Sequence, residues 1–262
     1  MIGRGEITKQ AQRDGVDAQT VERDYILAHA AVDIASIAGK DMILKGGTSL
    51  RLAHYDDYRY SADLDYSLLG ITTADALAYI GDALGRCRAR IGVDMLVLDA
   101  VAEPPRITYV GPLAAKPRTI KLDLADDELV VEHTHLPLIV AWRDLPEHAE
   151  IYGYTLTEIC AEKLRCVVQR RQCRDVFDLW NLLDARGGVD PFDAWHRFER
   201  KATHKDIEPN RFFDRWESSL KWYRSKWDDE LADYIGNDLP DFNTVHRALN
   251  RHITEIRDYV GG

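Results

Sequence analysis

Apolar residues recur at helical spacing in two separate parts of the chain. Early in the sequence this period predicts helices over residues 18–38 and 72–91, with Thr72 or Thr73 as the N-cap of the second. From Thr155 onward the periodic segments are all helical. The helices predicted there cover residues 155–170, 175–185, 193–202, 210–227 and 243–259. We therefore expect the last part of the chain to be entirely helical.

Short apolar or alternating runs earlier in the chain predict strands. One strand ends at Leu44 and leads through a Gly-Gly turn into a short helix that starts near Thr48, with Thr48 or Ser49 as its N-cap. The other predicted strands cover residues 62–69, 94–101, 106–110 and 118–124. Residues 126–150 are mixed and broken by proline. The pattern predicts an α+β domain over residues 1–150 and a helical domain over residues 151–262.

The composition is that of a globular chain with an excess of negative charge. Hydrophobic residues make up 45% of the 262 residues and charged residues 30%, which excludes a disordered or fibrous protein. A formal net charge of −10 excludes a general nucleic-acid coat. Residues 161–227 are an exception, because they hold 15 basic and 11 acidic side chains. This local excess suits either a solvated helix face or a polyanionic partner.

Cysteine spacing and hydropathy indicate a cytoplasmic protein without a membrane segment. Cys87, Cys160, Cys166 and Cys173 show no C-x-x-C spacing, so we expect reduced, packed thiols. The N-terminal residues lack the apolar core of a signal peptide. No segment reaches the roughly 20 apolar residues that span a bilayer.

Two carboxylates in a predicted strand are the first candidates for chemistry. Because strand side chains alternate, Asp63 and Asp65 share one face, about 7 Å apart. Such a pair repels itself unless a cation lies between, and carboxylate oxygens are the ligands that Mg²⁺ prefers. An exposed acidic strand face is the alternative interpretation. In the strand over residues 118–124, Lys121 and Asp123 share one face, and Asp123 would add a third carboxylate if the two strands are neighbours.

A lysine within an apolar stripe is the second candidate. Ile159, Lys163 and Val167 stand one above another at i, i+4 and i+8 of a predicted helix. Burying an unpaired ammonium is costly, so Lys163 needs a partner. A triphosphate is one possible partner, and Asp175 or Asp178 is another.

The order of these motifs resembles a known family. K-G-G-T-S-L-R over residues 45–51 and R-Y-S-A-D-L-D over residues 59–65 resemble the opening motif of the nucleotidyltransferase fold. T-I-K-L-D-L, T-x-x-E-I-x-A-E-K-L and R-D-V-F-D-L follow, and this succession is similar to the AbiEii family, the nucleotidyltransferase toxins of bacterial AbiE and MenAT toxin–antitoxin systems. The resemblance runs from about Asp24 to Leu183. It implies a polymerase β-like nucleotidyltransferase fold with a helical C-terminal domain.

Carried over residue by residue, the resemblance implies Mg²⁺-dependent transfer of a nucleotide from an NTP. Asp63 and Asp65 would hold Mg²⁺, with Asp123 as a candidate third metal ligand. Lys163 would neutralise the triphosphate, and Asp178 completes the implied catalytic set. The implied nucleotide-binding residues are Gly46, Gly47, Thr48, Ser49, Ser61, Lys163 and Asp175. Such an enzyme supplies position and charge rather than covalent chemistry.

The family also implies an RNA acceptor, with the tRNA 3′ acceptor end as the leading expectation, and a cognate antitoxin protein as a partner. Modification of that end would block translation and growth. The candidate RNA-binding residues in the basic window are Arg165, Arg170, Arg171, Lys201 and Lys205. Five aromatic residues near them would either stack a base or, as their helical spacing favours, form core; they are Phe212, Phe213, Trp216, Trp222 and Tyr223.

Two other functions stay open at this level. The same fold would serve an enzyme that modifies a small molecule such as an antibiotic, or a protein, and the net charge of −10 suits a cationic drug better than RNA. A binding protein that is held by an antitoxin is the third interpretation, although the intact set of carboxylates and lysine argues against it.

Overall fold

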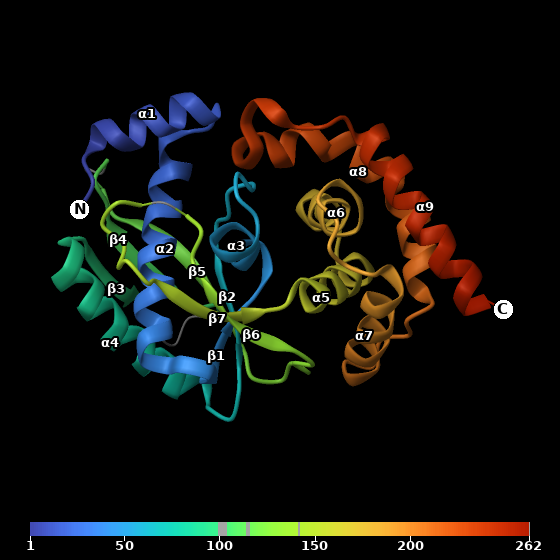
Figure 1. The fold of residues 1–262 in the computed structure, drawn as a ribbon, viewed down its shortest axis with the longest axis horizontal. Coiled ribbons are helices and arrows are strands. Elements are labelled where there is room, and N and C mark those ends of the chain that lie inside the picture. The colour runs from blue at the N-terminus through green and yellow to red at the C-terminus, as the bar shows by residue number, and fades with distance from the viewer. Residues whose placement is uncertain (99–103, 114–115, 141, 262) are drawn as a thin grey trace. The chain divides into compact units, whose positions relative to one another are not determined.

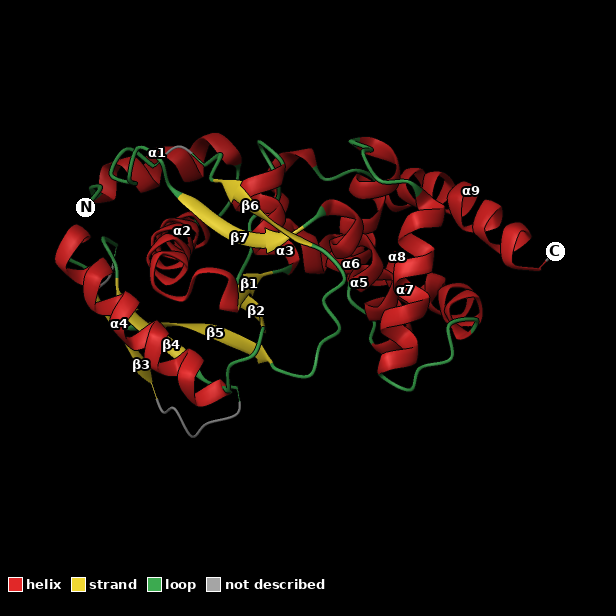
Figure 2. Cartoon of the chain, turned by 60° about the horizontal axis from the view of Figure 1, so that its bottom comes forward, coloured by secondary structure: helices red, strands yellow, loops and turns green. Residues whose placement is uncertain are grey.

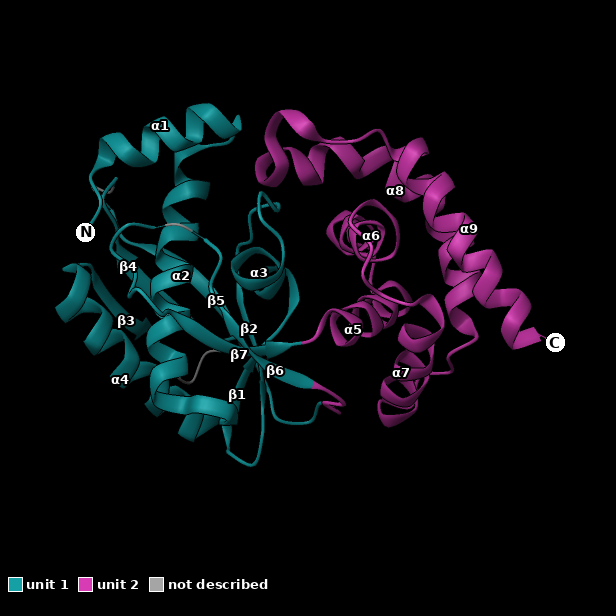
Figure 3. Cartoon of the chain, in the orientation of Figure 1, with its two compact units in different colours: residues 1–128, 133–154 teal, residues 129–132, 155–262 magenta. Residues whose placement is uncertain are grey.

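The computed structural model describes residues 1–98, 104–113, 116–140 and 142–261. These residues divide into two compact units (Figure 3). The first unit holds Met1–Glu128 and His133–Tyr154, and the second holds Leu129–Glu132 and Thr155–Gly262. The sequence analysis places one boundary at residue 150. The structure places the main boundary after Tyr154 and adds a short earlier segment to the second unit.

The first unit is a mixed sheet with helices packed against it, so the α+β class is confirmed (Figure 1). Within the described residues, seven strands form one sheet in the order β3-β4-β5-β2-β1-β7-β6. Their bounds are β1 Met42–Leu44, β2 Leu64–Leu68, β3 Asp94–Leu98, β4 Arg106–Val110, β5 Arg118–Ala125, β6 His133–Pro137 and β7 Glu150–Tyr154. The pairs β2–β5 and β1–β7 are parallel, and the other neighbours are antiparallel.

Two long helices, α2 (Ala18–Ala38) and α4 (Thr73–Ile91), pack against each other and against the sheet (Figure 2). Thr72 caps α4 in a capping box with Asp75, as one of the two expected caps. The helix α1 (Arg4–Asp14) precedes them and is absent from the sequence prediction. A short 3-10 helix, η1 (Gly39–Asp41), joins α2 to β1.

The predicted strands lie near their expected positions, and two further strands are present. β6 lies within the mixed segment over residues 126–150, whereas β7 begins at the end of that segment and continues into residues 151–154, which the sequence analysis assigns to the helical domain. β7 pairs with β1 through Gly153 and Leu44, a contact between residues distant in the chain. The strand predicted over residues 94–101 is observed over Asp94–Leu98, and residues 99–101 lie outside the described residues.

The short helix after β1 begins earlier than predicted. It comprises α3 (Gly46–Ser49) and a π-helical turn, η2 (Leu50–His54), and its N-cap is Lys45. The prediction of Thr48 or Ser49 as the cap is wrong. The Thr48 hydroxyl is used elsewhere, because Oγ1 lies 2.5 Å from the carbonyl oxygen of Asp63.

The second unit is helical, as predicted, apart from its loops. Its elements are α5 Leu156–Gln169, α6 Cys173–Trp180, η3 Asn181–Ala185, α7 Pro191–His204, α8 Arg211–Ile235, η4 Gly236–Asp238 and α9 Phe242–Gly261. Aromatic rings fill its core, and Trp195 stacks on Phe213 with ring centroids 5.1 Å apart. Phe212, Trp216 and Tyr223 are fully buried. The core interpretation of these aromatic residues is therefore correct, and the base-stacking one is wrong for them.

The cysteines and the hydropathy agree with the sequence analysis. Cys87, Cys160, Cys166 and Cys173 are free and buried. Burial raises the pKa of the Cys166 thiol to about 11 and raises the pKa of Cys87 and Cys160 further. Along the described parts of the chain, none of the helices has the length and apolar character that crossing a membrane requires.

Candidate active site

The strand β2 presents the Asp65 carboxylate on one side of the sheet. Leu64, Tyr66 and Leu68 point to the buried side, so the alternation of the strand turns Asp65 to the other. Asp63 comes directly before the strand, and both carboxyl side chains are partly exposed. A face shared by Asp63 and Asp65 stays a prediction from the sequence.

The strand β5 brings a third carboxylate beside them. β5 runs parallel to β2, with Asp123 opposite Asp65. The Asp123 side chain is 49% exposed, and its Oδ2 lies 3.9 Å from the ammonium of Lys121. Nowhere in the described residues do three or more His, Cys, Asp or Glu side chains gather into a metal cluster. Asp123 therefore lies opposite Asp65 in the sheet, but it does not belong to a preformed cluster of metal ligands.

The donor set still fits a hard divalent cation. Mg²⁺ usually binds through one or two carboxylates and completes its octahedron with water and substrate phosphates. Asp63 and Asp65 supply carboxylate oxygens, and both side chains are partly exposed. A preformed cage of protein ligands is not required for this kind of site.

The first residues of α3 lie against the Asp65 carboxylate. Gly46 has a φ of +70°, which favours glycine, and a Cβ there would lie 2.9 Å from Asp65 Oδ2. The hydroxyl of Thr48 is 2.8 Å from Ser61 Oγ. These contacts fasten the Gly-Gly segment to the start of β2, so the two motifs meet in space.

One implied nucleotide-binding residue, Ser49, is buried against the sheet. Ser49 is fully buried on the other side of α3, and a Cβ at Gly153 of β7 would lie 3.0 Å from its Oγ. Its hydroxyl packs the helix onto the sheet, so the expectation for Ser49 is corrected. Thr48 and Ser61 are also buried, and they bond to each other.

Two buried cations flank the glycines and are absent from the predicted site. Lys45 Nζ lies 3.8 Å from Glu128 Oε1, and both side chains are largely buried. Arg59 donates from Nη1 to the carbonyl oxygen of Tyr60, at 3.0 Å. Both residues stand inside the K-G-G and R-Y-S motifs, so the sequence contained the signal but not their burial.

The remaining implied catalytic residues form a buried cluster in the second unit. Lys163 Nζ lies 2.8 Å from Asp175 Oδ1 and 2.7 Å from Asp178 Oδ2. Arg170 Nε lies 2.9 Å from Asp175 Oδ2. Burial alone would raise the pKa of Asp175, but the charges of Lys163 and Arg170 outweigh it and lower that pKa. The aspartates, named above as one possible partner of Lys163, are thus its partners here.

Two of the candidate RNA-binding cations are engaged inside the second unit. Lys201 is 1% exposed, and its Nζ donates to Glu158 Oε1 at 2.6 Å and to the carbonyl oxygen of Leu129 at 2.8 Å. Arg165 is 6% exposed and bonds Gln169. Both charged groups bond to partners inside the second unit, which speaks against these two residues as RNA contacts. Arg170 and Arg171 are exposed, and Lys205 is partly exposed.

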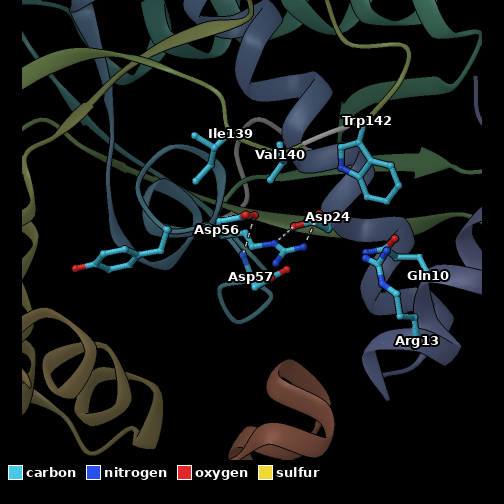
Figure 4. Close-up of a pocket in the computed structure, with 10 residues that line it drawn as sticks. Gln10, Arg13, Asp24, Asp56, Asp57, Ile139, Val140 and Trp142 are labelled. Carbon is cyan, nitrogen blue, oxygen red and sulfur yellow. Dashed lines mark hydrogen bonds and ion pairs between the residues drawn. The ribbon is translucent and has the colours of Figure 1, made fainter. Parts of the chain in front are cut away.

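A pocket of about 200 Å³ lies elsewhere in the first unit (Figure 4). Its lining includes a buried ion pair in which Arg51 Nε is 3.0 Å from Asp24 Oδ1. Tyr55 and Trp142 supply aromatic surface. Arg51 is the last residue of the K-G-G-T-S-L-R motif, and the other residues that line this pocket lie outside the quoted motifs.

The first unit thus combines a mixed sheet with the Asp65 carboxylate of β2 against the Gly-Gly segment that follows β1. A model of the family described as "Nucleotidyl transferase AbiEii toxin, Type IV TA system" matches residues 30–250. The chain therefore belongs to the AbiEii family of nucleotidyltransferase toxins.

Solved structures agree with this membership at the level of fold. MenT4, a nucleotidyltransferase toxin from Mycobacterium tuberculosis H37Rv, is 17% identical with a TM-score of 0.58, over 88% of this chain and 99% of that one. JHP933 from Helicobacter pylori is 20% identical with a TM-score of 0.53, over 94% of this chain and 95% of that one. A comparison with curated protein sequences finds no match. The protein is a nucleotidyltransferase of a type IV toxin–antitoxin system, with a nucleotide substrate and an antitoxin partner.

Proposed function

We propose that this enzyme uses Mg²⁺ to transfer a nucleotidyl group from an NTP to RNA, at the tRNA 3′ acceptor end. The observation that carries the proposal is the partly exposed Asp65 carboxylate of β2, which lies against the first residue of α3, with Asp63 two positions before it. Membership of a toxin family supports an acceptor whose modification stops growth. The cytoplasm, where tRNA and NTPs are present, is the proposed location.

In this mechanism the chain's own residues hold and orient the reactants. Asp63 and Asp65 would hold Mg²⁺, which offsets the charge of the phosphates during in-line displacement of pyrophosphate. Gly46 admits the Asp65 carboxylate, and Thr48 with Ser61 fixes the start of β2. Held in this way, the carboxylates need little rearrangement when the substrate binds.

The second unit is proposed to supply further charged groups. The resemblance assigns Lys163 to the triphosphate and Asp175 and Asp178 to the same motif. Arg170, Arg171 and Lys205 are the candidate RNA contacts that keep exposed surface. If they bind the RNA backbone, binding weakens steeply with added salt.

The test incubates the purified protein with bulk tRNA, Mg²⁺ and each α-labelled NTP in turn. We expect label on tRNA, and a loss of about 100-fold or more in Asp65→Asn, because the amide cannot replace a carboxylate on the metal. Asp82→Asn is the matched control, since Asp82 is an exposed carboxylate on α4. Labelling that persists in Asp65→Asn would contradict the assigned role of the carboxylates.

A small-molecule or protein acceptor is the second candidate. The burial of Lys201 and Arg165 favours it, because it removes two cations from the proposed RNA surface. The net charge of −10 favours it as well. Transfer of label to an aminoglycoside, with none to RNA, would decide for this acceptor.

A further inference from the structure

Arg59 rests directly on the backbone of Gly47. A Cβ at Gly47 would lie 2.5 Å from Arg59 Nη2, closer than a real Cβ comes to a neighbouring atom, and 3.1 Å from its Cζ. The side chain is 5% exposed, and its Nη1 is held by the carbonyl oxygen of Tyr60. Gly47 does not have the left-handed φ of Gly46. Glycine at position 47 therefore leaves room for the guanidinium of Arg59, and its backbone conformation does not require glycine.

The guanidinium and the Asp65 carboxylate lie on consecutive glycines. A Cβ at Gly46 would lie 2.9 Å from Asp65 Oδ2, and a Cβ at Gly47 would lie 2.5 Å from Arg59 Nη2. Consecutive Cα atoms are about 3.8 Å apart. The Gly-Gly segment thus seats one fixed cation next to one proposed metal ligand.

A guanidinium held in this place can bind phosphate oxygens as well as pair with a carboxylate. Arginine is the side chain whose planar fork matches phosphate oxygens, and its burial sets the direction of its donors before the ligand arrives. A nucleoside triphosphate brought to Asp63 and Asp65 with a metal ion places phosphate oxygens beside these residues.

We propose that Arg59 binds the phosphate chain of the nucleotide, and that position 47 is glycine to admit its guanidinium. The proposal rests on the proposed function, since it assumes that the triphosphate binds at Asp63 and Asp65. It assigns a substrate-binding residue that the motif comparison leaves without a role.

The test separates phosphate binding from metal binding. The probes are inorganic triphosphate with Mg²⁺, followed by calorimetry, and Mn²⁺ alone, followed by electron paramagnetic resonance. Arg59→Ala should weaken triphosphate binding roughly 10- to 100-fold, the effect of losing a charged hydrogen bond. The same variant should bind Mn²⁺ alone equally well or more tightly, because a cation is removed from beside the carboxylates. Arg88→Gln, on an exposed part of α4, is the control for loss of charge.

A double-mutant cycle tests the role of Gly47. Gly47→Ala should weaken triphosphate binding as Arg59→Ala does, because the new methyl group displaces the guanidinium. In the Arg59→Ala background, Gly47→Ala should add little, since nothing is left to displace. Gly81→Ala, where a Cβ meets no atom within 4 Å, is the control and should leave binding unchanged.

The results distinguish phosphate binding by Arg59 from a structural role of Arg59 and from failure of the proposed function. Triphosphate binding that survives in folded Arg59→Ala overturns the proposal, as does an equal loss of Mn²⁺ binding, which would mean that Arg59 merely holds Asp65 in place. If Arg59→Ala fails to fold, Arg59→Lys and Gly47→Ala are tested in its place. We expect weakened triphosphate binding in both variants, and unchanged binding would overturn the proposal. If the unaltered protein neither binds triphosphate nor labels any acceptor, the proposed function itself has failed.

Discussion

At the scale of single residues, contacts decide what composition and spacing leave open. Lys163 in an apolar stripe has the same sequence pattern whether it meets a substrate or a carboxylate. The structure shows Asp175 and Asp178 within 2.8 Å of its ammonium. Buried charges of this kind are stable only together, because removing one leaves the others unpaired in a low-dielectric interior.

A buried histidine in the first unit makes its stability depend on pH. His29 is fully buried; Arg90 Nη1 lies 2.6 Å from its Nδ1 and Asp144 Oδ1 lies 3.2 Å from its Nε2. The arginine can only donate, so Nδ1 accepts and the ring is neutral with its proton on Nε2. Burial and the charge of Arg90 lower the pKa of His29 to about 4.

This shift predicts a loss of stability in mild acid. The unfolded histidine takes up a proton near pH 6.5 and the folded one does not, so the stabilisation is complete above pH 6.5 and falls between pH 6.5 and 4, by about 3 kcal/mol in all. Urea unfolding at pH 7 and pH 5 measures the slope of the free energy of unfolding against pH. His29→Gln should reduce that slope. An unchanged slope in that variant would show that another group titrates.

The chemistry of the site was predictable from the sequence where it depends on alternation. Asp65 faces away from the buried side because strand side chains alternate, and Asp123 lies opposite it once β5 is placed beside β2. The burial of Ser49, Arg59 and Lys201 was not predictable, because it depends on which elements pack above them. Short polar motifs identify residues but not the direction in which each side chain points.

At the scale of elements, local signals predicted the helices better than the edge of the sheet. α2 and α4 have long apolar periods and clear caps, so their bounds match closely. β6 and β7 are five residues each and gain their stability from pairing with each other and with β1. Pairing across such sequence distances leaves no local pattern to detect.

The start of α3 allows a direct test at this scale. Gly46→Ala forces a left-handed φ on an alanine, at a cost of about 1–2 kcal/mol, and pushes a methyl group against Asp65 Oδ2. We expect nucleotidyl transfer to fall at least about 10-fold, because the carboxylate must move. Transfer assays and urea unfolding measure the two effects separately. Full activity in Gly46→Ala would mean that the Asp65 position is not critical.

At the scale of the whole molecule, the short segment Leu129–Glu132 belongs to the helical second unit, although the rest of that unit begins only at Thr155. Glu158 Oε1 accepts the N–H of Val131 at 3.0 Å and the ammonium of Lys201 at 2.6 Å. Lys201 also donates to Leu129. This buried network is the physical reason why Leu129–Glu132 belongs to the second unit.

Glu158→Gln should release that segment. The amide leaves the Lys201 ammonium without its carboxylate, and we expect faster hydrogen exchange at Val131 together with a loss of about 3–5 kcal/mol in the stability of the second unit. Hydrogen exchange read by mass spectrometry over residues 128–136 checks the first effect. Glu208→Gln, at an exposed carboxylate of the same unit outside the segment, is the control. Unchanged exchange would mean that other contacts hold the segment.

The same interleaving restricts how genes for such proteins can recombine. The backbone passes between the units after Glu128, after Glu132 and after Tyr154. A crossover at a single point after Tyr154 would give a chimera whose helices come from one parent and whose Leu129–Glu132 comes from the other. The mismatch would fall on the buried partners of Glu158 and Lys201, so the two units are expected to be inherited together rather than exchanged as modules.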